Sequence, residues 1–171
     1  MDNRKRLLMA AIEVRGGSPV GSDELIRLAL DALLDGVDTP ALRQLAGLTR
    51  AEEPEARDLF EVVIDELDLA PTLPEHPDDA RWVLVRWWCE LIADERIEPA
   101  AGARRLWMIR HELRDPRPLA PLMAVLAQLD DLFWKPGALP EAGRREIVAA
   151  AGELIARNST VIPSGELGAG P

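Results

Sequence analysis

The chain has 171 residues, 47% of them hydrophobic and 29% charged, which is enough for one well-buried core or two small joined subdomains. Its formal net charge of −10 argues against DNA, RNA or anionic lipid as a partner, because these are polyanions. No apolar run approaches the roughly 20 residues that span a bilayer. We therefore expect no membrane span and a cytoplasmic protein.

Apolar residues recur at spacings of three and four along the chain, and the alternating pattern of exposed strands is nearly absent. The sequence predicts an all-α fold, a single compact bundle or orthogonal array of about seven or eight helices. We predict an acidic helical subdomain over residues 1–69 and a proline-rich connection over 70–78. A tryptophan-rich subdomain packed on the first should cover 79–157, and a disordered tail 158–171.

In the N-terminal half, Ser22 is a candidate helix cap and Gly36 can end the helix that follows. Thr39 and Pro40 then open a short helix that Gly47 ends. A third helix starts afresh at Pro54, since proline does not fit inside a helix, and runs to about residue 68.

The helix over residues 54–68 is amphipathic. At 100° per residue its apolar side chains fall on one side, and Glu55, Asp58, Glu61 and Asp65 fall on the other. Residues 23–68 carry thirteen acidic against four basic side chains, or −9. Two interpretations stay open, a solvated face and a binding surface for a basic partner.

One weak internal similarity relates "ALLDGVDTPALRQL", which starts at Ala32, to "LIADERIEPAAGARRL", which starts at Leu91. Each places an acidic residue five positions before a proline that can be the first residue of a helix. Each segment is thus predicted to be a helix, a short turn and a second helix. The shared feature is turn chemistry more than common ancestry.

The stretch "RWVLVRWWCELI", from Arg81, contains three tryptophans, and a helix over it is apolar except for a narrow polar sector. The favoured interpretation is a central helix whose tryptophans pack in the core, each indole N–H needing an acceptor. The alternative is an aromatic pocket lined by Trp87, Trp107 and Trp134. The single cysteine, Cys89, cannot form an internal disulfide, and burial should raise its pKa.

Residues 104–117 are the one basic concentration, with five arginines against two acidic residues. On the helix predicted here, Arg104, Arg105 and His111 point away from the buried stripe. They are expected to form a solvated face, or to contact an acidic partner or the acidic helix of a second copy.

No assembled catalytic set is visible, so we expect no enzyme, no cofactor and no metal site. The acidic helix lacks the Glu-x-x-His pairs of a di-iron bundle, no serine lies in a nucleophile elbow, and no phosphate-binding glycine loop is present. A helix-turn-helix is conceivable over residues 38–68, but its second helix is rich in acidic residues that phosphates would repel.

The segments "LIADERIEPAAGARRLWMI" and "LLDGVDTPALRQLAGLTRAEEPEARDLFEVVIDELDL" resemble small helical proteins of unassigned function from high-GC actinobacteria. This resemblance implies an all-helical fold and no particular activity. Some small acidic helical proteins of such genomes look like immunity or inhibitor partners of toxins. We therefore expect a non-enzymatic protein-binding module. The alternatives are a small-molecule binder or enzyme with a tryptophan pocket, and a helix-turn-helix regulator.

Overall fold

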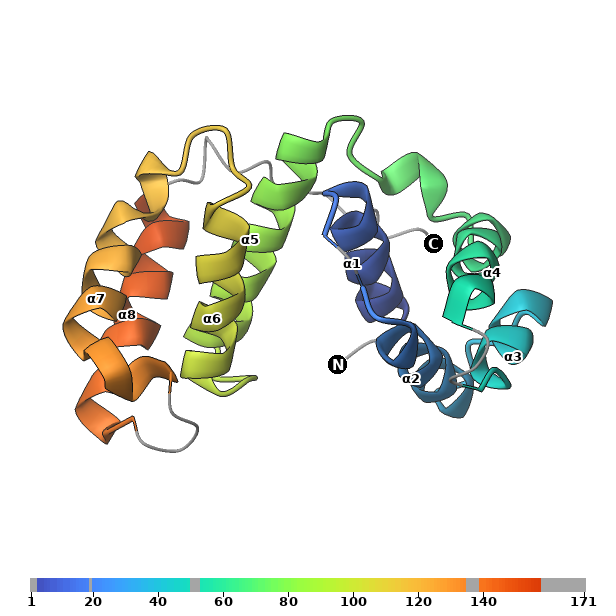
Figure 1. Ribbon diagram of the computed structural model, residues 1–171, viewed down its shortest axis with the longest axis horizontal. Helices are drawn as coiled ribbons and strands as arrows, with labels where there is room; N and C mark the ends of the chain where they lie inside the picture. The colour runs from blue at the N-terminus through green and yellow to red at the C-terminus, as the bar shows by residue number, and fades with distance from the viewer. Residues whose placement is uncertain (1–2, 19, 50–52, 135–138, 158–171) are drawn as a thin grey trace. The chain divides into compact units, whose positions relative to one another are not determined.

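A computed structural model of the chain describes residues 3–18, 20–49, 53–134 and 139–157, except for the side chains of residues 53–54 and 130–134. Within these residues it contains eight α-helices, two short 3-10 helices and no strand, which confirms the predicted all-α class (Figure 1). The helices form two compact units, Met1–Ala80 and Arg81–Pro171. The boundary lies in the first turn of a helix, just after the predicted connection at 70–78.

The first unit is built from four α-helices and a short 3-10 helix. Leu7, Leu25, Leu42, Leu45 and Phe60 are almost completely buried there. The elements are α1 (Asn3–Arg15), α2 (Ser22–Leu34), α3 (Pro40–Ala46), α4 (Glu53–Glu66) and η2 (Ala70–Thr72), and α2 packs against α1, α3 and α4.

Two arginines of α1 fix that helix to its neighbours. Arg6 forms an ion pair with Asp31 of α2 at 2.7 Å, and Arg4 donates to the carbonyl oxygen of Leu67, just after α4, at 2.7 Å. Carbonyls at a helix C-terminus have no partner within the helix, so Arg4 satisfies one of these acceptors. The N-terminal half of α1 is thereby held beside the C-terminal end of α4.

The short helix α3 begins as its sequence predicts. Thr39 is the N-cap, its hydroxyl accepts from the amide of Leu42 at 3.2 Å, and Pro40 is the first helical residue. The expectation for α2 was wrong by one residue. Gly21 occupies the N-cap position and Ser22 is the first residue of the helix.

The second unit contains α5 (Pro77–Ala93), most of which belongs here, α6 (Pro99–Arg110), η3 (Arg117–Leu119), α7 (Ala120–Trp134) and α8 (Glu141–Arg157). α6 packs against α7 and α8, and α7 packs against α8. The predicted buried stripe of α6 is confirmed, since Gly102, Leu106 and Ile109 are buried and Leu113 after it is buried too. The side chains of Ile92 and Ile97 lie against Gly102 of α6 and leave no room for a Cβ there.

The two related segments form the same turn. The backbone amides of Asp35 and Asp94 each donate to the carbonyl oxygen four residues earlier. The amide of the next residue, Gly36 or Glu95, donates to the carbonyl oxygen three residues earlier. The amides of Val37 and Arg96 then donate five residues back, which completes the same C-terminal cap in both. Each turn leads into a proline at the first helical position. The predicted sharing of turn chemistry is confirmed.

No helix within the described residues is both long enough and apolar enough to cross a membrane.

Candidate functional site

The four acidic residues predicted from the pattern of α4 are all exposed. We call Glu55, Asp58, Glu61 and Asp65 the acidic face; they span about 120° of the helix at 100° per residue. The opposite side of α4 is buried in the first unit through Ala56, Phe60, Val63, Ile64 and Leu67. Burial of that side fixes which way the carboxylates point, because a helix cannot turn without exposing its apolar stripe.

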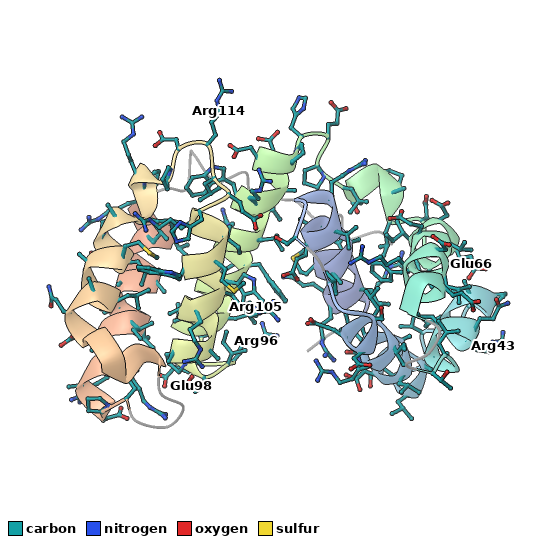
Figure 2. The ribbon with its side chains drawn as sticks, in the orientation of Figure 1. Arg43, Glu66, Arg96, Glu98, Arg105 and Arg114 are labelled. Atoms are coloured by element: carbon teal, nitrogen blue, oxygen red, sulfur yellow. The ribbon has the colours of Figure 1, made fainter. Side chains whose placement is uncertain are left out.

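None of the four carboxylates of the acidic face forms an ion pair or a hydrogen bond with another described residue. The neighbouring Glu66 behaves differently, since it accepts from the backbone amide of Ala41 at 2.9 Å and so caps α3. Figure 2 shows Glu66 on α4, near the helix that carries Arg43, and Arg43 itself pairs with Asp38 at 2.9 Å. The acidic face is therefore not used to hold the described fold together.

A groove runs along one side of the acidic face, between α1 and α4, and η2 and Leu73 line it as well. Its cavity volume is about 280 Å³. Both helices contribute residues at spacings of three and four, as neighbouring positions on one helix face require. The lining residues are Ala11, Val14, Arg15, Glu61, Ile64, Asp65, Ala70 and Leu73.

The floor of this groove is apolar and its rim is charged. Ala11 and Ile64 are only 2% and 3% exposed, whereas Arg15, Glu61 and Asp65 are exposed. The rim carries two carboxylates against one guanidinium, so its local charge is negative. Of the four predicted acidic residues, the structure brings Glu61 and Asp65 to the groove, and Glu55 and Asp58 lie elsewhere on α4.

A second hollow, of about 210 Å³, adjoins the first at Val14 and Glu61, which line both. Leu25 and Phe60, both buried, provide apolar lining there, and Arg57 contributes a charge. Glu61 is therefore the only member of the acidic face that borders both of these hollows. Sequence analysis could not find either hollow, because each depends on how α1 packs against α4.

Val62 is an exposed hydrophobic residue among the carboxylates. Its side chain is 46% exposed, and it lies four residues after Asp58 and three before Asp65 on the same side of α4. Interfaces between proteins commonly combine an apolar centre with a polar rim. The wheel of this helix already places Val62 beside the acidic residues, so the sequence contains the signal.

The basic segment 104–117 is already engaged in contacts within its own unit. Arg104 lies 3.8 Å from Glu98, and Arg105 lies over the ring of Trp88 with 5.7 Å to the centroid. Arg110 lies over Trp107 at 5.6 Å, and His111, which is exposed, meets the edge of the same ring. Figure 2 shows Arg105 among the side chains around α5 and α6. The prediction that Arg104 and Arg105 point away from the core is only partly right, because both are half-buried.

Arg117, at the end of the basic segment, pairs with Asp115 at 2.7 Å. Hydrogen bonds from Arg117 lower the pKa of Asp115 to about 2, since they stabilise the charged carboxylate. This pair is exposed, so it adds little to the stability of the fold.

The tryptophans of α5 divide between core and partial exposure. Trp82 is buried, whereas Trp87 and Trp88 are half-buried with ring centroids 4.7 Å apart. The indole nitrogen of Trp88 is buried without an acceptor among the described residues, so the expectation that each indole has one fails here.

Of the three tryptophans predicted to line an aromatic pocket, the structure describes the side chains of Trp87 and Trp107. Trp107 is half-buried on α6 and contacts Arg110 and His111. The side chain of Trp134, at the end of α7, lies outside the described residues. Neither of the hollows at α1 and α4 is lined by a tryptophan.

Cys89 is completely buried, as its neighbours predict. Burial raises the pKa of its thiol to about 12, and the negative charge of Glu90 adds to the effect. A thiol with this pKa is protonated at neutral pH and is a poor nucleophile. In the described part of the chain no group of three or more His, Cys, Asp or Glu side chains is arranged to hold a metal ion.

Comparison of the chain with models of protein families, with curated proteins and with solved structures found no match.

Proposed function

We propose that this protein is a non-enzymatic binding module that engages a basic protein surface through the acidic face of α4. The observation that carries the proposal is the contrast between two charged surfaces. Four arginines of segment 104–117 contact acidic or aromatic side chains of their own unit, namely Arg104, Arg105, Arg110 and Arg117. The four carboxylates of the acidic face, by contrast, have no partner among the described residues.

Like charges held on one helix face repel each other, and this repulsion opposes folding as long as no partner neutralises them. An opposite charge brought by another protein would remove this repulsion and would steer its approach. The exposed Val62 supplies an apolar contact inside the same surface. Inhibition of a basic enzyme or toxin, as by an immunity protein, is the most concrete form of this function.

The test uses the full chain as bait for proteins of the host cell at low ionic strength. A partner that binds through exposed charges should be released as salt rises, since the screening length falls to about 10 Å at 0.1 M. The recovered partner is then titrated against the quadruple variant E55Q/D58N/E61Q/D65N. We expect its affinity to fall at least about tenfold, because four attractive charges are lost.

A matched control is E75Q/D79N/E141Q/E146Q, which removes the same charge from four exposed residues that are not part of the acidic face. This control should change the affinity less than about twofold at equal ionic strength. Equal losses in the two variants would show that only the net charge matters and would contradict the proposal. Partners that bind equally well at all salt concentrations would contradict it too.

A further inference from the structure

We infer that the groove between α1 and α4 receives a lysine or arginine side chain of the basic partner. This inference rests on the proposed function and makes it more specific. It names the position where one cationic side chain of the partner inserts, while Glu55 and Asp58 act only through their charge.

The lining of the groove matches the two parts of such a side chain. Lysine and arginine carry an aliphatic stem that favours apolar surface and a charged end that stays near water or a counter-charge. The groove offers Ala11, Val14 and Ile64 to a stem. Its carboxylates, Glu61 and Asp65, are one helical turn apart on the same face of α4, so a single cation can approach both.

The volume of the groove also fits one side chain better than a larger ligand. About 280 Å³ holds a single long side chain with some water, and it lies just below the range of 300–1,000 Å³ typical of small-molecule sites. The groove is bordered by exposed Arg15, Glu61 and Asp65. Its charged edges therefore lie where a side chain from another protein surface would enter.

Substitution of Arg15 should change the affinity of the groove in a direction that depends on the charge of its ligand. It lines the groove from the end of α1, and it forms no ion pair with Glu61 or Asp65 in the structure. Its charge opposes an incoming cation, so Arg15→Gln should strengthen binding. A groove built for a carboxylate ligand would show the reverse, since Arg15 would then be its only cationic contact.

The basic segment 104–117 of a second copy is a less suitable source of the cation. The arginines at 104, 105, 110 and 117 already contact acidic or aromatic side chains of their own unit, and inserting one would break that contact. In keeping with the proposed function, we assign the side chain to a different protein. A dimer abolished by E61Q/D65N would overturn this assignment.

The experiment is an NMR titration of the full chain at low ionic strength with two probes. One is Nα-acetyl-lysine amide, and the other is the amide of Nα-acetyl-2,4-diaminobutyric acid, which has a stem shorter by two methylenes; at pH 6 both probes carry one positive charge. We expect the lysine probe to shift the methyl signals of Val14, Ile64 and Leu73. Its affinity should exceed that of the short probe by at least about threefold, because only its stem reaches the apolar floor.

Two variants with the same change of charge locate the site. E61Q/D65N should weaken the lysine probe at least about fivefold, and E55Q/D58N, on the same helix but outside the groove, less than about twofold. A circular dichroism melt of each variant checks that α4 is intact. Equal weakening by the two pairs, or equal affinity of the two probes, would overturn the inference.

Failure of the groove as a binding site can be distinguished from failure of the proposed function. If both pairs weaken the recovered partner equally, the acidic face binds as a diffuse charged surface, and the proposed function stands without the groove. If the quadruple variant keeps full affinity for that partner, the proposed function fails, whatever the lysine probe does.

Discussion

Glu95 occupies, after α5, the left-handed backbone position that Gly36 occupies after α2. Their φ angles are 52° and 85°, and the amide of each donates to a carbonyl three residues earlier at 3.0 Å. A side chain at positive φ brings Cβ close to the following carbonyl, whereas glycine has no Cβ. Both turns therefore need a residue in the left-handed conformation. Glycine adopts it without strain at position 36, whereas glutamate adopts it with strain at position 95.

Replacing Glu95 with glycine is therefore expected to stabilise the protein by about 1 kcal/mol. Gly36→Ala should destabilise it by a similar amount, because it introduces the strain that Glu95 already carries. The change at Gly36 introduces no steric clash, since a Cβ built there meets no atom within 4 Å. Urea unfolding followed by circular dichroism gives both values. A loss of stability in Glu95→Gly would show that the Glu95 side chain has a contact that outweighs the strain.

Helix positions, the buried side of α4 and the two related turns could all be predicted from the sequence, because each depends on residues three to five positions apart. Thr39 with Pro40 shows this most clearly, since a capping side chain and a fixed φ act within one turn. The acidic face follows from the same periodicity.

The groove and the contacts made by the arginines of segment 104–117 could not be predicted, because they depend on how the helices pack against each other. Nothing near Glu61 in the sequence indicates that Ala11 and Val14 of α1 lie beside it. Likewise, Arg105 and Trp88 are seventeen residues apart, and only the packing of α5 with α6 places one over the other. Periodicity gives the direction of a side chain but not its neighbour.

Gly102 and Gly152 lie inside helices and should respond in opposite ways to alanine. A Cβ at Gly102 would lie 2.6 Å from Cγ1 of Ile92 and 2.6 Å from Cδ1 of Ile97, whereas one at Gly152 meets nothing within 4 Å. Gly152→Ala should gain about 0.5–1 kcal/mol from helix propensity. Gly102→Ala should lose about 1–2 kcal/mol, since overpacking exceeds the same gain. Two variants of equal stability in urea unfolding would contradict the close approach of α5 and α6.

Cys89 should make the free energy of unfolding depend on alkaline pH. The pKa of the folded thiol is about 12, against 9.0 for an unperturbed one. The stability that the neutral thiol provides is fully present below about pH 9 and is lost as pH rises towards 12, because only the unfolded chain releases the proton in this range. The chain has no tyrosine and two lysines, so few other groups titrate there.

The measurement is the urea midpoint of wild type and Cys89→Ala at pH 8 and pH 10.5. Cys89→Ala should be less stable at pH 8, because it leaves a small cavity, but its midpoint should fall less between the two pH values. A thiol reagent at pH 8 should modify the wild type only in denaturant. Rapid modification of the folded protein would show that the thiol is accessible, contrary to its burial.

Trp88 should tolerate phenylalanine better than Trp82 does. Both replacements remove indole surface, but the indole N–H of Trp88 is buried without an acceptor among the described residues. Phenylalanine removes this unsatisfied donor, whose burial costs about 1–3 kcal/mol, and so offsets the lost packing. Trp88→Phe is expected to be at least about 1 kcal/mol less destabilising than Trp82→Phe in urea unfolding.

Arg105 lies over the Trp88 ring and can also lie over phenylalanine, so Arg105→Ala should cost a similar amount of stability in the wild type and in Trp88→Phe. A larger loss in Trp88→Phe than in Trp82→Phe would mean that the indole nitrogen of Trp88 has an acceptor in solution.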